Sequence, residues 1–275
     1  MTSQRADDVC ALPLVRRLAA MLDRDPSLFK DGDPLPRGWY PILFNLPTRQ
    51  SQLRDDGAGD LALPLPDLGL PRLMIAGRRA QFITDISIGA RMSRTSRAGE
   101  PEIKEGRTGR FALVSVEHQV FQDDALQPAL IETQHYVLKE AAPPTLGRGR
   151  AVESKSPAKS ESIADATRVL LPDERLLFRY SALTDNPHRI HYDRAYAREV
   201  EGYPDLIVNG TIPLMFLLEM RRGLDASAPT VIETRNLAPM LCGQPLRLCV
   251  RKMETGWRMW AEGVAGMPVF EALAS

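Results

Sequence analysis

Two of the chain's four histidines lie close together in the stretch YSALTDNPHRIHYD, residues 180–193. Histidine suits acid–base work because its reference pKa of about 6.5 lets it exchange a proton near neutral pH. His188, His191 and Asp193 also form an H-x-x-H-x-D string, and two histidines three residues apart on a helix can share a metal ion. A third ligand and the H-E-x-x-H context are missing, so we predict no metal.

A second stretch, EGYPDLIVNG, ends at Asn209 and Gly210 immediately before a long apolar run. The run, TIPLMFLLEM, is apolar on nearly every side until Arg221 and Arg222, and a helix of that kind is buried all round. Pro213 is compatible with the first turn, where a missing N–H is tolerated. The start of such a helix offers free N–H groups and a positive dipole end. Gly210 is therefore a candidate donor to a developing oxyanion.

The elements that would position these residues repeat in the two halves of the chain. Hydrophobic periodicity predicts a helix over 208–222, followed by strands over 231–237, 246–253, 257–264 and 268–273. In the first half it predicts a helix over 12–23, a buried apolar segment over 39–46, and strands over 78–85, 90–97, 111–121 and 130–138. We therefore expect an α+β fold with two antiparallel sheets, each wrapped around a buried helix.

A change of composition divides the chain. Residues 143–162, PPTLGRGRAVESKSPAKSES, have the Gly, Pro, Ser and Lys content of a linker. A chain of 275 residues fits two domains. We predict one domain over residues 1–142 and a second over residues 163–275.

The overall composition excludes several classes of protein. The 35 basic side chains balance 35 acidic ones, which gives no indication of nucleic-acid binding. Three cysteines are too few for a disulfide framework or a four-thiolate zinc site, so we expect a reducing compartment. No apolar stretch approaches the roughly 20 residues that span a membrane. The segment 1–25 is typical of neither a signal nor a transit peptide, and we interpret it as a surface helix of a cytoplasmic protein.

Several stretches resemble one known family. In the first half these are GDPLP, the pair Trp39 and Tyr40, LPTRQSQL, GLPRLMIAGRRAQF and the turn KEGRTG; in the second they are FRYSALTDNPHRIHYDRAYA and EGYPDLIVNG. Over nearly the whole chain they resemble the double-hotdog hydratases and dehydratases related to MaoC and to (R)-specific enoyl-CoA hydratases. The pattern is most similar to mesaconyl-C4-CoA (3-methylfumaryl-CoA) and itaconyl-CoA hydratases, and to mitochondrial 3-hydroxyacyl-thioester dehydratases.

This resemblance implies a double hotdog with a noncatalytic first domain and an active site in the second. The family pairs a carboxylate or amide with a histidine five residues later, which here gives Asn186 and His191. Because Asn cannot take a proton, His191 would be the base and Asn186 would orient water. Many relatives have Asp where this chain has Asn186, and His-Gly where it has Asn209 and Gly210. The backbone role of Gly210 is kept, whereas a side-chain role for Asn209 is in doubt.

The implied activity is addition of water to an α,β-unsaturated acyl-CoA, or its removal. That reaction needs a base for the water and a group that stabilises charge on the thioester oxygen. Coenzyme A would be part of the substrate, so no cofactor is expected. The pattern indicates a short branched dicarboxylic acyl group, with Arg189 a candidate for its second carboxylate. For Arg189, a contact with coenzyme A phosphates or a solvated position are the alternatives, and Arg107 in KEGRTG could line the thioester tunnel.

Other functions stay open at this point. One is a 3-hydroxyacyl-thioester dehydratase of fatty-acid or polyketide synthesis. Others are a hotdog thioesterase and a noncatalytic acyl-CoA-binding protein, since fold alone does not separate these activities. Because isolated sheet edges invite association, we expect the two hotdogs to pair edge to edge as an internal pseudo-dimer. A homo-oligomer through other surfaces also stays open.

Overall fold

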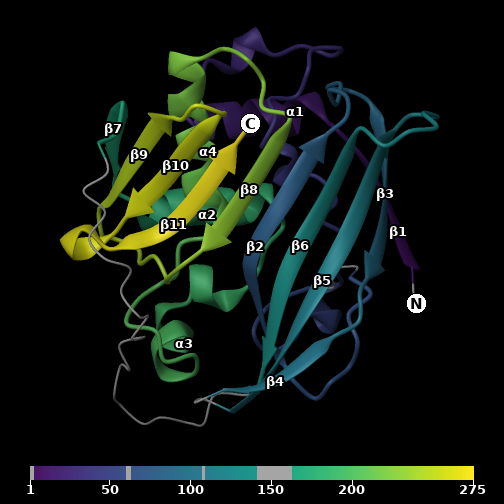
Figure 1. Ribbon diagram of the computed structural model, residues 1–275. Helices are drawn as coiled ribbons and strands as arrows, with labels where there is room; N and C mark the ends of the chain where they lie inside the picture. Colours follow the sequence, from purple (N-terminus) through teal and green to yellow (C-terminus); the bar gives the residue numbers. More distant parts are fainter. Residues whose placement is uncertain (1–2, 60–62, 107–108, 141–162) are drawn as a thin grey trace.

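The structure is a computed structural model that describes residues 3–59, 63–106, 109–140 and 163–275. Its strands form one antiparallel sheet in the order β1-β3-β5-β6-β2-β8-β11-β10-β9-β7, with β4 paired to β5 at the side (Figure 1). The first half contributes β1 (Ser3–Val9), β2 (Arg72–Phe82), β3 (Arg91–Ala98), β4 (Glu102–Gly106), β5 (Gly109–Gln122) and β6 (Leu130–Lys139). The second half contributes β7 (Ala166–Leu170), β8 (Val231–Asn236), β9 (Leu246–Lys252), β10 (Trp257–Glu262) and β11 (Pro268–Ala274).

Four α-helices and several short 3₁₀ turns complete the described fold. The α-helices are α1 (Leu12–Met21), α2 (Glu174–Leu183), α3 (Arg194–Glu199) and α4 (Thr211–Leu224). The 3₁₀ turns are η1 (Pro26–Leu28), η2 (Tyr40–Ile42), η3 (Gln50–Gln52), η4 (Arg189–His191) and η5 (Val264–Gly266). None of the helices in the described part of the chain has the length and apolar character needed to cross a membrane.

The two halves are joined by backbone pairing between β2 and β8. The register runs from Gly77 opposite Arg235 to Gln81 opposite Val231. At Gly77 the strands approach so closely that a Cβ atom would lie 2.3 Å from the carbonyl oxygen of Thr234, which explains the glycine. This pairing confirms the predicted internal pseudo-dimer, because each half covers what would otherwise be an open sheet edge of the other.

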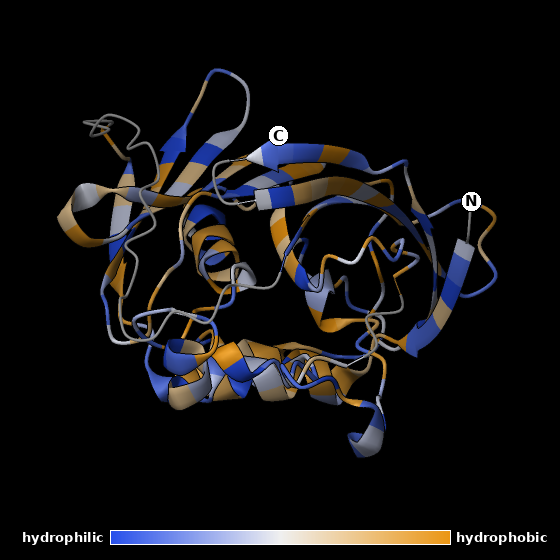
Figure 2. Cartoon of the chain, turned by 90° about the horizontal axis from the view of Figure 1, so that it is seen from below, coloured by the Kyte–Doolittle hydropathy of each residue, from blue (hydrophilic) through white to orange (hydrophobic). Residues whose placement is uncertain are grey.

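The second half is built around α4, as its apolar sequence predicts. Residues 211–218 of α4 are all buried, and the helix packs against β9 and β10. Figure 2 shows the sheet arching over both halves of the chain. The first half encloses no comparable long helix within the described residues. Its interior is filled by the predicted apolar segment, in which Trp39, Tyr40 and residues 42–44 are buried, while α1 packs against α2.

The prediction for the N-terminal segment is wrong. Residues 3–9 form the edge strand β1, which pairs with β3, and α1 buries Val15, Leu18, Ala19 and Met21 in the core. The helix over 12–23 is therefore confirmed, but it does not lie on the surface. The strand depends on hydrogen bonds from β3, about 90 residues away in sequence, and no local pattern records that partner.

Every strand predicted in the two halves is present. The largest difference is at β2, which begins at Arg72 and not at residue 78. The strands β4 and β7 were not predicted, because five residues each are too few to show a period. The helix α2 was also not predicted; it buries only Leu177 and Tyr180. The predicted linker over 143–162 and Arg107 lie outside the described residues.

Candidate active site

The loop between α2 and α3 carries the histidines. Helix α2 ends at Thr184, and Asp185 follows with a left-handed φ of 42°, a conformation that Asp tolerates better than most residues. Beyond η4, the Asp193 carboxylate accepts a hydrogen bond from the Tyr196 N–H at 3.0 Å and caps α3. The loop is thus held at both ends, and His191 lies between these fixed points.

His191 is buried and its ring orientation is determined by one hydrogen bond. Nδ1 lies 2.7 Å from the carbonyl oxygen of Ile207, and because a carbonyl only accepts, Nδ1 must carry the proton. Nε2 is then left with a free lone pair. Burial lowers the pKa of His191 to about 4, although the bond to Ile207 opposes the shift. His191 is therefore a neutral imidazole near pH 7, in the form that a general base requires.

Asn186 belongs to the same loop and makes a tight turn. Its Oδ1 accepts a hydrogen bond from the backbone N–H of His188 at 3.2 Å. The side chain is half-buried, and its oxygen stabilises the loop. The turn role explains the Asn-Pro pair locally. The further role predicted for Asn186, positioning the water, stays a prediction.

His188 was considered in the sequence only as a metal ligand. Its ring lies 5.8 Å from that of His191, edge to face, and burial lowers its pKa. Within the residues that the structure describes, no group of three or more His, Cys, Asp or Glu side chains is arranged to hold a metal ion. His188 is a neighbour of the buried base.

Gly210 lies at the N-terminus of α4, where sequence analysis placed it. Asn209 Oδ1 accepts from the Thr211 N–H at 3.0 Å, and the Asn209 carbonyl accepts from the Ile212 N–H at 3.0 Å. Pro213 has no N–H. The Gly210 N–H makes no hydrogen bond to any part of the chain that the structure describes. Asn209 thus accepts from the first two N–H groups of α4, while the N–H of Gly210, the N-cap residue, is left free.

Hydrogen bonds tie the His191 loop to the segment that precedes Gly210. The Ile207 N–H donates to the Ile190 carbonyl at 2.9 Å, and the Ile207 carbonyl accepts from His191 Nδ1. The Val208 N–H donates to the Met240 carbonyl at 2.8 Å, which fixes the segment leading into α4. The loop that carries His191 is therefore anchored to the segment that leads into Gly210 and α4.

Arg189, two residues before His191, lies at the surface of the loop and not beside the buried imidazole. Its Nε and Nη2 donate to Asp193 Oδ2 at 3.1 and 2.8 Å, and its Nη1 donates to the Asp55 carbonyl at 3.1 Å. The guanidinium stacks on the Tyr196 ring, 4.0 Å from its centre. The side chain is 38% exposed, whereas His191 is buried. Arg189 is thus engaged in a surface ion pair, and its position does not support the predicted contact with a substrate carboxylate.

Comparisons with known proteins decide the family. Residues 38–242 match the model of the family described as hydroxyacyl-thioester dehydratase type 2. The chain belongs to this family. Its members are hydro-lyases, and the predicted class of enzyme is confirmed.

Individual relatives agree with this assignment. Over 273 residues, 98% of this chain and 94% of the relative, the chain is 34% identical to a mesaconyl-C(4)-CoA hydratase of Chloroflexus aurantiacus. A mitochondrial hydroxyacyl-thioester dehydratase type 2 of Schizosaccharomyces pombe is 34% identical over 102 residues, 36% of this chain and 34% of that protein.

Solved structures confirm the double-hotdog fold. HtdX of Mycobacterium tuberculosis superimposes with a TM-score of 0.68 at 17% identity, covering 99% of both chains. A second protein of that organism, described as a double hotdog, has a TM-score of 0.62 at 13% identity and covers 100% of this chain and 95% of its own. These likenesses concern the fold.

Sequence reasoning missed three side chains of this dehydratase-family site. Arg78, from β2 of the first half, places Nη2 3.4 Å from Thr211 Oγ1. Tyr180 of α2 lies beside Thr211, and burial raises its pKa. Asn236 of β8 donates to the Ile75 carbonyl at 2.9 Å, and its buried Oδ1 has no partner within the described chain. They come from elements far apart in sequence, so no local motif could reveal them.

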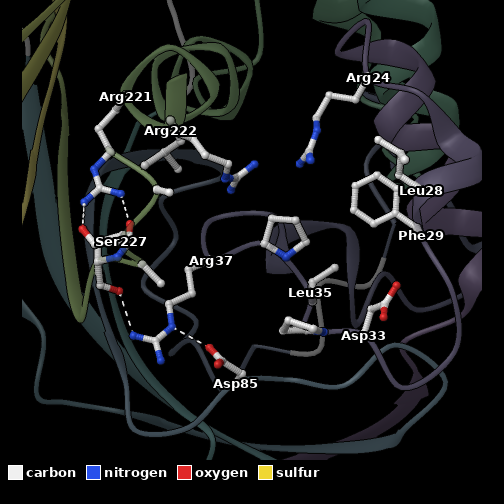
Figure 3. A pocket seen from close by; sticks show the side chains of 16 residues that line it. Arg24, Leu28, Phe29, Asp33, Leu35, Arg37, Asp85, Arg221, Arg222 and Ser227 are labelled. Atoms are coloured by element: carbon white, nitrogen blue, oxygen red, sulfur yellow. Dashed lines mark hydrogen bonds and ion pairs between the residues drawn. The ribbon is translucent and has the colours of Figure 1, made fainter. Parts of the chain in front are cut away.

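A cavity of about 310 Å³ lies at the other end of α4 (Figure 3). Four arginines line it: Arg24, Arg37, Arg221 and Arg222. Each has a partner, and Figure 3 shows Arg37 directed at Asp85, with 2.8 Å between Nε and Oδ1, and Arg221 directed at Ser227. A 14-residue helix is about 20 Å long, so this cavity is remote from Gly210 and His191.

Proposed function

We propose that this protein adds water to a short, branched dicarboxylic acyl-CoA of the mesaconyl or itaconyl type. The observation that carries the proposal is the 34% identity to a mesaconyl-C(4)-CoA hydratase over 98% of the chain. Two features support the proposal: His191 is a neutral buried imidazole anchored to Ile207, and Gly210, three residues farther along that segment, has a free N–H.

In the proposed mechanism His191 Nε2 takes a proton from water as the water oxygen bonds to the β-carbon of the enoyl group. The carbon–carbon π electrons move toward the thioester, and the Gly210 N–H stabilises the resulting negative oxygen at the positive end of α4. The His191 imidazolium then returns the proton to the α-carbon. Dehydration follows the same steps in reverse.

Asn186 would direct the water. Its side chain is half-buried in the loop that also carries His191, and its NH₂ group is not used in the bond to His188. We propose that the water is positioned by this pair. In relatives with Asp at this position the carboxylate could share the base role, which Asn186 cannot do.

The test is a panel of thioesters offered to the purified protein. It contains mesaconyl-CoA, itaconyl-CoA, crotonyl-CoA and a long-chain enoyl-CoA, and product is followed by the mass gain of one water. We expect the dicarboxylic substrates to have the highest kcat/KM. Release of free thiol without hydration would identify a thioesterase, and binding without turnover would identify an acyl-CoA-binding protein.

A second candidate is a 3-hydroxyacyl-thioester dehydratase of fatty-acid or polyketide synthesis. The match of residues 38–242 to the dehydratase family model favours it. The fungal relatives are similar over only 36% and 26% of the chain, which is why we place this function second. A higher kcat/KM for the long-chain enoyl-CoA than for the dicarboxylic substrates, together with dehydration of the matching 3-hydroxyacyl-CoA, would reverse the order.

We further propose that the reaction needs no cofactor beyond the coenzyme A of the substrate, and that the protein works in the cytoplasm. The residues proposed for the mechanism are a histidine, an amide and a backbone N–H. All three cysteines are buried free thiols, as suits a reducing compartment. Dialysis against EDTA should leave kcat unchanged. Loss of activity that Zn²⁺ or Mg²⁺ restores would contradict this.

A further inference from the structure

The cavity at the C-terminal end of α4 lies where the first half repeats the backbone of the proposed active site. In the second half, an isolated antiparallel bridge holds Ile207, three residues before Gly210. In the first half, a bridge of the same kind holds Pro34, three residues before Arg37. Pro34 and Arg37 both line the cavity. The cavity therefore occupies the position in the first half that the proposed active site occupies in the second.

The loop that follows the first helix of each half matches as well. Asp23 follows α1 with a φ of 58°, as Asp185 follows α2 with a φ of 42°. Each loop continues into a 3₁₀ turn, and the last residues of η1 and η4 are Leu28 and His191. Leu28 lines the cavity, but its side chain cannot take a proton. The first half thus has a pocket at the position of an active site, without a base.

Two of the four arginines in this cavity are engaged by the fold. Arg37 Nε donates to Asp85 Oδ1 at 2.8 Å. Arg221 Nη2 donates to Ser227 Oγ at 2.9 Å and lies 3.8 Å from an oxygen of Asp225. Each of these guanidinium groups has a carboxylate of its own.

The other two arginines, Arg24 and Arg222, share the carboxylate of Glu219. Arg222 Nη1 donates to Glu219 Oε1 at 2.5 Å, whereas Arg24 Nε lies 3.6 Å from Oε2. Within the part of the chain that the structure describes, Arg24 makes no hydrogen bond, and its guanidinium lies 4.9 Å from the centre of the Phe29 ring. The two side chains are 28% and 29% exposed. Two partly buried cations with one counterion leave one positive charge uncompensated.

Figure 3 shows Arg24 and Arg222 on opposite walls, with their guanidinium groups directed toward one another. Burial and, to a smaller extent, the charge of Arg222 lower the pKa of Arg24, although Glu219 opposes the shift. Asp33 also lines the cavity, but in the described chain its carboxylate pairs with none of the arginines and accepts from the Lys30 N–H at 2.8 Å. An anion between the two guanidinium groups would remove their repulsion.

Much of the remaining wall is apolar, and the side chains of Leu28, Phe29, Leu35 and Leu218 belong to it. The cavity volume is about 310 Å³. Because one water molecule takes about 30 Å³ in the liquid, this volume holds about ten non-hydrogen atoms. Inorganic phosphate would contact the guanidinium groups and leave the apolar wall unused. A carboxylate with a short alkyl chain would use both.

We propose that this cavity binds a short-chain monocarboxylic acid in its ionised form, with the carboxylate between Arg24 and Arg222 and the alkyl chain against the apolar wall. One carboxylate supplies the single negative charge that the two arginines lack, and a guanidinium can donate two parallel hydrogen bonds to it. The ligand is bound and not converted, because Leu28 stands where a base would be needed. The inference does not depend on the proposed hydratase function.

The experiment measures the dissociation constant of hexanoate by isothermal titration calorimetry in the parent, Arg24→Met, Arg222→Met and Arg175→Met. Arg175 is the matched control, because it is an exposed arginine of α2 that pairs with Asp173. Each cavity variant should bind hexanoate about 10–100-fold more weakly, since a charged hydrogen bond is lost. Arg175→Met should bind it as the parent does. Equal affinities in all four proteins would overturn the site.

The chemical class of the ligand is tested in the parent with acetate and inorganic phosphate. Acetate should bind roughly 10-fold more weakly than hexanoate or worse, because it lacks the alkyl chain that contacts the apolar wall. Phosphate should fail to displace hexanoate at equal concentration. Phosphate that binds more tightly than hexanoate would overturn the proposed ligand.

Two further variants separate this cavity from the fold and from the proposed active site. Arg24→Lys keeps the charge and should bind hexanoate with an affinity between those of the parent and Arg24→Met, because lysine cannot donate in the bidentate geometry. Circular dichroism checks that each variant is folded. His191→Ala should bind hexanoate as the parent does. If His191→Ala loses binding and Arg24→Met keeps it, hexanoate occupies the proposed active site and the inference is wrong, whatever the hydration assays show.

Discussion

In the second half of the protein, β8–β11 enclose α4, and the first two turns of that helix are buried among apolar side chains (Figures 1 and 2). In the first half, β2, β3, β5 and β6 enclose irregular chain, and their inner face carries a buried polar stripe that includes Arg94, His118 and Glu132. The same sheet architecture thus surrounds two different interiors. A rigid apolar helix fixes one donor N–H in place. The proposed chemistry belongs to the half that contains the buried helix, whereas the other half contains the buried polar groups.

The sharpest test of this assignment is removal of the proposed base. His191→Ala should lower kcat about 10²–10⁴-fold while the protein stays folded, because general base catalysis contributes that much. His135→Ala is the matched control from the first half: this exposed histidine of β6 bonds Ser115 Oγ at 2.9 Å and should be dispensable. Rates come from steady-state hydration assays and folding from circular dichroism. Near-normal turnover in His191→Ala would show that a group other than His191 acts as the base.

Substitution of Asn186 should give the next largest loss of kcat. Asn186→Leu should lose about 10–100-fold in kcat, because a group that orients water is removed and the N–H of His188 loses its acceptor. Asn186→Asp should stay active, since Asp keeps the acceptor and can itself act as a base. The pH profile of kcat/KM in the Asp variant should then move. If Asn186→Leu hydrates as fast as the parent, Asn186 is a turn residue only.

A pair of glycines in α4 tests the helix end itself. At Gly210 a Cβ atom would lie 2.5 Å from Asn236 Oδ1, so Gly210→Ala must shift either the helix start or Asn236. We expect kcat to fall about 10-fold, a partial loss of the stabilisation that an oxyanion donor provides. Gly223→Ala, at the other end of α4, meets nothing within 4 Å. It should keep full activity and gain about 0.5–1 kcal/mol in unfolding free energy. Equal activity in both variants would remove Gly210 from the mechanism.

A further comparison concerns acid stability, to which both halves contribute a buried histidine. Burial lowers the pKa of His118 and of His191 to about 4 from 6.5. The unfolded chain therefore binds protons that the folded chain rejects, and stability is lost as the pH falls from 6.5 toward 4. Each histidine should account for roughly 3 kcal/mol of this loss.

Urea unfolding of His118→Gln at pH 7 and pH 4.5 measures the share of the first half. The difference in unfolding free energy between the two pH values should be smaller than in the parent. His135→Gln, in which an exposed histidine is replaced, should keep the parent's difference. An unchanged difference in His118→Gln would mean that the first half does not contribute to acid lability.

Much of the second half could be predicted because its signals are local. A helix apolar on every side has to be buried, and α4 is. The spacing of Asn186 and His191 and the position of Gly210 depend on neighbouring residues. In the structure a hydrogen bond from His191 to Ile207 ties the loop that carries the first two to the segment that precedes Gly210. Strand alternation likewise predicted β8–β11 and most of the first-half sheet.

Other features depend on partners that are remote in sequence, and only the tertiary structure decided them. Residues 3–9 become a strand because β3 supplies the hydrogen bonds. Arg189 lies next to the catalytic motif in sequence, but Asp193 and Tyr196 hold it at the surface. Arg78 and Arg94 look like ordinary strand arginines until sheet pairing directs both inward. Sequence determines which residues can do chemistry, whereas the curvature and register of the sheet decide which of them reach the substrate.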